Sequence, residues 1–294
     1  MLLSDILKLE DFMNRKWINK FFLLICWLVT VASALTLIFL LTVIVFNGAQ
    51  AINLDFLFTC SRDFGAEGGI FYQIIGSILL IIGASLISFP IALGTAIFKS
   101  EYLKNNFLQR LSSILVYGLN GIPSIIFGIF GLIFFVHFLE TGISWFVGAV
   151  ILAIMIIPTI VLAAYQSINS IPKIYRDSAL ALGLNRWQVI LKVVFPQGIS
   201  GAITGLLIGA ARAIGETAPI MFIATAFSGV EMPGSLFEPV TALPTHILAL
   251  AQHATDSQAL KNAWGTSLVL IILVFVFSVS ALFTRIKLKP VSQR

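Results

Sequence analysis

The chain has 294 residues, of which 59% are hydrophobic and only 11% charged, and its mean hydropathy is +1.01. Soluble proteins carry about 45–50% apolar and about 25% charged residues, so this composition excludes a soluble globular domain and indicates a protein embedded in lipid. The net charge of +5 would suit a nucleic-acid partner, but the cations are scattered between apolar runs and form no basic stripe, so we expect none.

Long apolar runs predict an all-α membrane protein with six transmembrane helices, because spanning helices need about 20 apolar residues. An N-terminal segment, residues 1–20, precedes the first run, which lacks a cleavage site and is expected to be retained. Only the fifth run contains charged residues, namely Arg212 and Glu216. The expected spans are 21–46, 70–98, 111–136, 141–165, 199–226 and 262–284.

The cations predict the orientation of these spans, since Lys and Arg accumulate in cytoplasmic loops. All 18 lysines and arginines except Arg62, Lys261 and Arg212 lie in segments that would be inside if both termini were cytoplasmic. We therefore expect a multi-pass protein of the inner (plasma) membrane, surrounded by lipid. Its cysteines, Cys26 and Cys60, fall in a span and an outer loop and should not pair, and its histidines show no metal-ligand spacing.

The segment between the fourth and fifth spans, residues 166–196, predicts two short helices. Pro172 suits the first turn of one helix, and Gly183 suits the left-handed residue that ends it. Asn185 and a glutamine three residues later form a capping-box pair, and Pro196 is expected to end the second helix. The first helix carries an apolar stripe and so suits a groove on another protein, although a helix lying on lipid is the alternative.

The spacing within this segment resembles the EAA loop of ABC-importer permeases. That loop has Glu-Ala-Ala, three residues, Gly, nine residues, and an apolar stretch ending in Pro. The sequence departs from it by Asp for Glu, Ser for the first Ala and conservative apolar changes. The resemblance implies that the first helix docks on a cytoplasmic ATPase, and its matching positions are Asp177, Ser178, Ala179, Gly183 and Pro196.

Three further stretches, residues 68–103, 121–131 and 211–222, look like phosphate-specific permeases of the PstA type. In the last of these, Ala218 and Pro219 follow Gly-Glu-Thr, a continuation that favours the PstA type over its PstC-type partner. The resemblance covers nearly all of residues 68–294 and implies a permease core over 70–294. The implied fold is that of a type I ABC importer permease with MetI-like architecture.

The same resemblance implies a complex that imports inorganic phosphate. Its other members would be a second permease of the PstC type, two ATPase subunits of the PstB type and an external phosphate-binding protein of the PstS type. ATP and Mg would be used by the ATPase, because this chain has no Gly-Lys dipeptide and so no P-loop. We therefore expect a transport subunit without a cofactor of its own, not an enzyme.

A charge near the middle of the bilayer costs about 2.5–3.5 kcal/mol on insertion scales, so Arg212 and Glu216 need an explanation. Four residues apart, they are expected to share a helix face, to pair, and to point into the bundle or a water-filled path. The arginine fork suits a tetrahedral oxyanion, and Glu216 would weaken its hold on the anion. The predicted pathway residues are Arg212, Glu216 and Thr217, with a purely structural ion pair as the alternative.

Glycine and proline shape the same run. Pro219 cannot donate a hydrogen bond to the carbonyl of Gly215, so the helix is expected to open beside Glu216. Upstream, Gly201, Gly205 and Gly209 repeat every four residues and predict a smooth ridge for close helix packing.

Several alternatives remain open at this point. A permease for sulfate or molybdate would use the same chemistry. An ion-coupled secondary transporter would show several intramembrane acids, and an intramembrane protease would show paired aspartates, but Glu216 is the single acid within the expected spans. The outer loop, residues 227–261, is expected to form a helix through 246–260 and to serve either as a lid or as a docking surface for an external partner.

Overall fold

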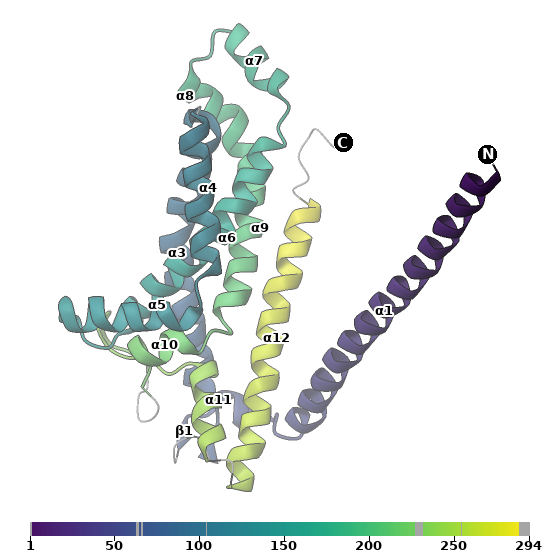
Figure 1. Cartoon of the computed structure of the whole chain (residues 1–294). Coiled ribbons are helices and arrows are strands. Elements are labelled where there is room, and N and C mark those ends of the chain that lie inside the picture. The colour runs from purple at the N-terminus through teal and green to yellow at the C-terminus, as the bar shows by residue number, and fades with distance from the viewer. Residues whose placement is uncertain are drawn as a thin grey trace.

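The computed structural model is a helical bundle (Figure 1). It describes residues 2–62, 65, 67–103, 105–226, 232–253 and 255–287, and side chains from residue 19 onward. The last seven residues of the expected permease core and part of the outer loop, at 227–231 and 254, lie outside this described part.

The α-helices in chain order are α1 Leu2–Ala49, α2 Leu54–Phe58, α3 Phe71–Ile97, α4 Asn106–Gly121, α5 Ser124–Gly131, α6 Trp145–Asn169, α7 Lys173–Ala181, α8 Arg186–Val189, α9 Phe195–Ala213, α10 Ala218–Ile223, α11 Leu243–Gln252 and α12 Ser257–Lys287. Three wider π-helical stretches are η2 Phe98–Tyr102, η3 Leu132–Phe138 and η4 Ile190–Val194. A two-stranded antiparallel hairpin joins β1 Ser61–Arg62 to β2 Glu67–Gly68.

Within the described residues, five helical segments are long and apolar enough to cross a membrane: Asn19–Ala49, Phe71–Tyr102, Trp145–Asn169, Arg186–Ala213 and Ser257–Lys287. A sixth crossing is possible if the bent pair Asn106–Gly121 and Ser124–Phe138 counts as one span.

The run expected as one straight span over 111–136 is therefore bent. Its two helices meet at 91°, and α5 lies across the bundle while α4 runs along it (Figure 1). Ile122 and Pro123 break the helix with extended ψ angles of 130° and 135°. The pyrrolidine ring of a proline disfavours the helical conformation in the residue before it, and this explains the bend.

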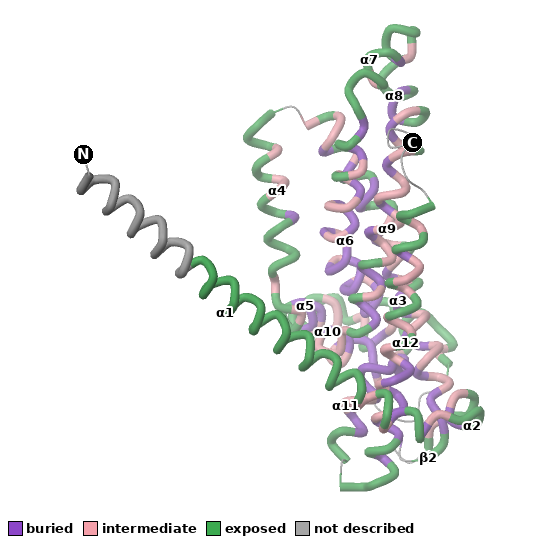
Figure 2. Tube along the Cα trace, turned by 90° about the vertical axis from the view of Figure 1, so that its right-hand side faces the viewer, coloured by how far each residue is buried: buried purple, intermediate pink, exposed green. Residues whose placement is uncertain are grey.

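Helix α6 forms the centre of the bundle, and α3 and α9 pack along it. Buried residues follow one another along its length in Figure 2, and Ile151, Ile156 and Ile160 are fully or almost fully enclosed. Lipid-facing positions are apolar as well, so burial here follows helix contact and not hydropathy alone.

The fifth expected span, 199–226, needs two corrections. Pro196 does not end a helix, because the helical segment continues from Arg186 to Ala213. The π-helical turn η4 ends at Val194, two residues before this proline, and the widened turn accommodates a residue without an N–H donor. At its other end the span stops at Ala213, short of residue 226, and a separate short helix, α10, follows.

At the end of the bundle opposite α7, the helix expected through 246–260 is divided. Helix α11 ends at Gln252, and α12 begins at Ser257. Helix α1 lies apart from the core, and the end of it that contacts α12 does so at Gly48, where a Cβ would lie 2.7 Å from the carbonyl oxygen of Trp264. Over Asn19–Ala49, none of the most apolar stretch of α1 is buried within the chain.

Candidate coupling loop and transport pathway

Helix α7 follows α6 and precedes α8 in the chain, and it lies at one end of the bundle (Figure 1). Gly183 has φ +82, and the amides of Gly183 and Leu184 donate to the carbonyls of Leu180 and Ala179 at 3.0 and 3.2 Å. A Cβ at Gly183 would meet nothing within 4 Å, so glycine is needed for its left-handed backbone and not for space.

The start of α8 has the predicted capping box. The amide of Gln188 donates to Asn185 Oδ1, and the amide of Asn185 donates to Gln188 Oε1, each at 2.9 Å. This reciprocal pair satisfies two amides that the helix itself leaves without partners, so it fixes the turn between α7 and α8.

The residues of α7 divide between the bundle and the outside. Ala179 is buried, while Asp177 and Ser178 are exposed. The apolar stripe predicted for this helix comprises Ile174, Tyr175, Ala179 and Leu182, and of these Ile174 and Leu182 are 68% and 81% exposed. The loop therefore presents large apolar side chains that no described part of the chain covers.

Arg212 occupies the last turn of α9, and Glu216 lies in the break beyond it. Arg212 Nε lies 3.5 Å from Glu216 Oε1, so the expected ion pair forms, although the two residues do not share one continuous helix. Arg212 Nη1 donates to Asn120 Oδ1 on α4 at 3.1 Å. The side chain of Arg212 is 41% exposed and that of Glu216 17%, so the guanidinium remains accessible.

Asn120 was missed by sequence reasoning. It is separated from Arg212 by 92 residues and lies within the run 111–136, where a single amide gives no signal of its own.

The break itself spans residues 214–217. The amides of Gly215 and Glu216 bond to carbonyls three residues back, which tightens the last turn before the helix ends. Thr217 is the N-cap residue of α10 and is half-buried. Pro219 lies in the first turn of α10, and a Cβ on Gly128 of α5 would approach its Cα within 2.8 Å. The opened backbone is thus held against α5.

A side-open groove of about 380 Å³ lies between α9 and α12 and contains Arg212. Arg285 from α12 also lines the groove, and none of the described residues that line it is acidic. Its polar hydroxyls come from Thr204 and Ser278, and its remaining walls are apolar: Ile208, Ala211, Val274, Ala281 and Leu282. The groove thus combines two cationic side chains and two hydroxyls with largely apolar walls.

The glycine ridge of α9 faces α6. A Cβ on Gly201 would collide with Ser167, one on Gly205 would lie 2.7 Å from Ala163 Cβ, and one on Gly209 would lie 3.1 Å from Ile156 Cβ. The two backbones approach closely because these side chains are absent, so the ridge fixes the position of the α9 face that carries Arg212.

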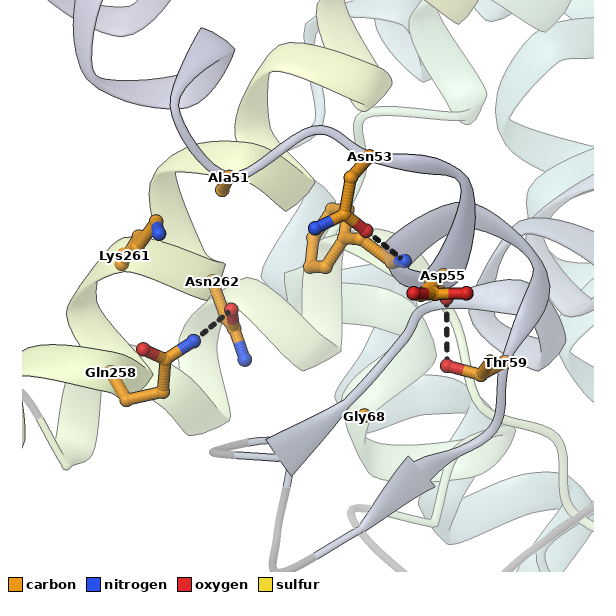
Figure 3. Close-up of a pocket in the computed structure, with 9 residues that line it drawn as sticks. Ala51, Asn53, Asp55, Thr59, Gly68, Gln258, Lys261 and Asn262 are labelled. Atoms are coloured by element: carbon orange, nitrogen blue, oxygen red, sulfur yellow. Dashed lines mark hydrogen bonds between the residues drawn. The ribbon is translucent and has the colours of Figure 1, made fainter.

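A second, polar pocket of about 240 Å³ lies at the α11 end of the bundle, between α2, β2 and α12 (Figure 3). Asn53 Oδ1 accepts from the amide of Phe56, Thr59 donates to the carbonyl of Asp55, and Gln258 donates to Asn262. These side chains already cap or join the local helices, so we assign the pocket no part in transport.

The outer loop has two parts in the described residues. Helix α11 is packed against the bundle, and its own residues Leu243, His246 and Leu250 are buried. Before it, Met232, Leu236 and Phe237 are each more than half exposed. The helix thus has the placement of a lid, while the preceding segment offers an apolar surface.

Residues 88–287 match the family described as the binding-protein-dependent transport system inner membrane component. The chain belongs to this family. These permeases are components of ABC importers, so the chain is an inner-membrane transport subunit and not an enzyme, and the ATPase is a separate subunit. The ion-coupled transporter and the intramembrane protease are therefore set aside.

Relatives of this permease support the assignment over most of its length. "Probable ABC transporter permease protein YqgI" of Bacillus subtilis is 31% identical, and the match covers 92% of this chain and 95% of that protein. The phosphate transport system permease protein PstA of Haemophilus influenzae is also 31% identical, with 92% and 94% covered. Among solved structures, a chain of the MetNI methionine ABC transporter matches with a TM-score of 0.59 at 16% identity, covering 75% of this permease and 98% of that chain. The MetI-like fold is thereby shown.

Proposed function

We propose that this permease imports inorganic phosphate and forms half of the translocation pathway with a second permease of the PstC type. The observation that carries the proposal is an accessible arginine, Arg212, in a groove without acidic residues, in a chain that is about 30% identical to PstA proteins over most of its length. A guanidinium forms bidentate, charge-assisted hydrogen bonds with tetrahedral oxyanions and stays protonated.

Glu216 would set how tightly the anion is held. Its carboxylate lies 3.5 Å from Arg212, beyond an ordinary hydrogen-bond distance, and competes with an arriving anion for the guanidinium. Conduction needs binding that is favourable enough to admit the ion and weak enough to release it. Thr217, in the same break, would add a hydroxyl to this path.

The proposed pathway is tested with uptake by membrane vesicles that contain the permease, the candidate second permease, the ATPase and the binding protein. We expect ATP-dependent uptake of labelled phosphate in preference to sulfate or molybdate. Arg212→Gln should abolish this uptake while the complex still assembles, and Arg110→Gln, which removes an exposed arginine on α4, should not. Equal uptake by the Arg212→Gln complex, or a preference for sulfate, would overturn the proposal.

We further propose that α7 docks on the ATPase, through Leu182 and Ile174 on its outer side and with Asp177 and Ser178 exposed beside them. An apolar face on a short helix suits a groove on a second protein. The resemblance implies that ATP binding moves this helix and tilts the spans between two states of access, with ATP and Mg bound by the partner. PstB-type ATPases and a PstS-type binding protein are the proposed partners.

A charge on this face tests the docking. Leu182→Asp should release the ATPase from the purified complex, whereas Leu182→Met should retain it. Bulky changes at Ala179 or Gly183 should displace α7 and stop transport, because Ala179 is buried and Gly183 has a positive φ. If ATPase binding and uptake both survived these changes, α7 would have no coupling role.

A further inference from the structure

The π-helical turn η2, at the end of α3, is in contact with three other elements through three successive side chains. Lys99 Nζ donates to Ser113 of α4 at 2.9 Å and lies 4.8 Å from the centre of the Tyr165 ring on α6. Ser100 donates to Asn169, the last residue of α6, at 3.0 Å. Successive side chains leave a helical turn in different directions, so neighbours can face different elements.

Glu101, the next residue, joins η2 to α7. Its Oε1 accepts from Arg176 Nε at 3.1 Å and lies 3.0 Å from Arg176 Nη2. Both side chains are 17% exposed, so this ion pair is better shielded from water than one at the open surface. Charge-assisted bonds of this geometry are stronger than those between neutral groups.

Arg176 also holds the end of α6. Its Nη1 donates to the carbonyl of Ile171 at 2.8 Å, and its Nη2 donates to the carbonyl of Ile168 at 3.0 Å. The Ile168 carbonyl already accepts from the amide of Ile171 at 3.2 Å, so the guanidinium adds a further donor at the end of α6. The main contacts of α7 otherwise are α8 and η4, which follow it in the chain. Arg176 therefore ties α7 to the elements that precede it.

We propose that the pair Arg176–Glu101, here called the α7–η2 link, makes α3, α4 and α6 move with α7 when the ATPase displaces it. The inference rests on the proposed docking of α7 on the ATPase. A displacement of α7 would be transmitted to η2 through Glu101. From η2 it would be transmitted to α4 through Lys99, and to α6 through Lys99 and Ser100. Arg176 and Glu101 are thus positioning residues for transport, since neither lines the groove that contains Arg212.

The test is the number of anions taken up for each ATP hydrolysed by the complete reconstituted complex, with labelled phosphate or, if the wild type prefers it, labelled sulfate. Glu101→Gln removes one charge and leaves the bonds from Arg176 to the carbonyls of Ile168 and Ile171 possible. We expect the ATPase to stay bound and to hydrolyse ATP, while uptake per ATP falls at least fivefold. Arg110→Gln, which removes an arginine with no ion pair among the described residues, should match the wild type.

Two further variants separate the link from simple stabilisation. Arg176→Gln combined with Glu101→Gln should transport no worse than Arg176→Gln alone, because both changes break the same pair. Arg176→Lys keeps the charge opposite Glu101 and should restore part of the lost coupling. Additive losses in the double variant, or no restoration by lysine, would overturn the proposal.

The remaining outcomes are also decisive. Unchanged uptake per ATP in Glu101→Gln, or failure of that variant to assemble with the ATPase, would mean that the pair has no coupling role or a structural one only. If Leu182→Asp released the ATPase while Glu101→Gln transported normally, the link would be wrong and the docking of α7 right. If Leu182→Asp left the ATPase bound, the docking proposal itself would fail.

Discussion

The guanidinium of Arg212 is held by contacts that are easily exchanged. Its carboxylate partner lies at 3.5 Å, its amide partner Asn120 lies at 3.1 Å, and the arginine side chain is 41% exposed. Exposed ion pairs contribute about 0–1 kcal/mol, and a typical hydrogen bond about 1 kcal/mol. An anion that offers two charge-assisted bonds can therefore displace either contact, and the resting arrangement orients the arginine without trapping it.

Substitution of Asn120 tests this orientation. Asn120→Leu removes the acceptor, worth about 1 kcal/mol, and should lower the rate of phosphate uptake about fivefold. Asn120→Asp places a second carboxylate beside Arg212 and should lower uptake further, because it competes with the anion. Uptake by vesicles at saturating phosphate gives the comparison. A rate for Asn120→Asp that equals the wild-type rate would contradict this role.

Residue-scale features were predictable where their cause is local. The left-handed Gly183 and the Asn185–Gln188 capping box follow from offsets of a few residues, and the structure has both. The partners of Arg212 on α4 and of Arg176 on η2 are 92 and 75 residues away, so no local pattern indicates them. Such contacts become visible only when the packing of the helices is known.

At the scale of elements, the close contact between α9 and α6 depends on glycines, which have no side chain to separate the two backbones. Gly205→Ala would bring a Cβ within 2.7 Å of Ala163 Cβ and 3.0 Å of the Ile160 backbone, and should destabilise the fold by about 1–3 kcal/mol. Gly118→Ala is the matched control, since a Cβ at this position of α4 meets nothing within 4 Å. It should be neutral or stabilising by up to about 1 kcal/mol. Thermal unfolding of the purified protein in detergent measures both, and equal midpoints would contradict the packing argument.

We expect the local stability of helix α11 to decrease at acidic pH. Burial lowers the pKa of His246 from 6.5 to about 4, and its Nε2 has no hydrogen-bond partner within the described residues. Because the unfolded state binds the proton more readily, stability is complete above pH 6.5 and falls as the pH drops from 6.5 toward 4. The loss amounts to about 3 kcal/mol at most for the opening of this site.

Hydrogen exchange in α11, measured at pH 7.5 and pH 5, reports this opening. After correction for the slower intrinsic amide exchange at pH 5, we expect lower protection factors at pH 5 than at pH 7.5 in the wild type. In His246→Gln, which cannot titrate, the protection factors should change little with pH. His253→Gln, which replaces the exposed histidine after α11, should behave as the wild type does. The idea fails if His246→Gln keeps the full pH dependence.

Element boundaries were less predictable than the elements. The breaks in the runs 111–136 and 199–226 fall at Ile122–Pro123 and at residues 214–217, and both lie inside long, mainly apolar runs. Hydropathy therefore continues across them. The second break was expected from Gly215 and Pro219, whereas the first was not, although a proline has the same physical effect there.

At the scale of the whole molecule, much of the apolar surface faces outward. The stretch Asn19–Ala49 of α1 is exposed along most of its length, and α3 and α12 also carry exposed large apolar side chains such as Leu86 and Phe275. A membrane protein in lipid needs no polar covering on such faces, so the composition that excluded a soluble domain is explained by the outside of the bundle as much as by its core.

The orientation of this molecule in the membrane is the last prediction. Helix α7 and the hairpin next to Cys60 lie at opposite ends of the bundle (Figure 1). The excess of Lys and Arg lies in the segments at the α7 end, so the positive-inside rule places α7 in the cytoplasm and Cys60 outside. Cys60 is exposed and can report this directly.

A membrane-impermeant maleimide applied to intact cells should label a Cys26→Ser variant, whose one remaining thiol is Cys60. A variant in which both cysteines are serine and Arg110→Cys has been introduced on α4 should be labelled only after the membrane is opened. Cys26, which is exposed in the spanning part of α1, should stay unlabelled because lipid covers it. If the Arg110→Cys variant were labelled in intact cells and Cys60 were not, the orientation in the membrane would be the opposite of the one predicted. The proposed docking of α7 on a cytoplasmic ATPase would then be impossible.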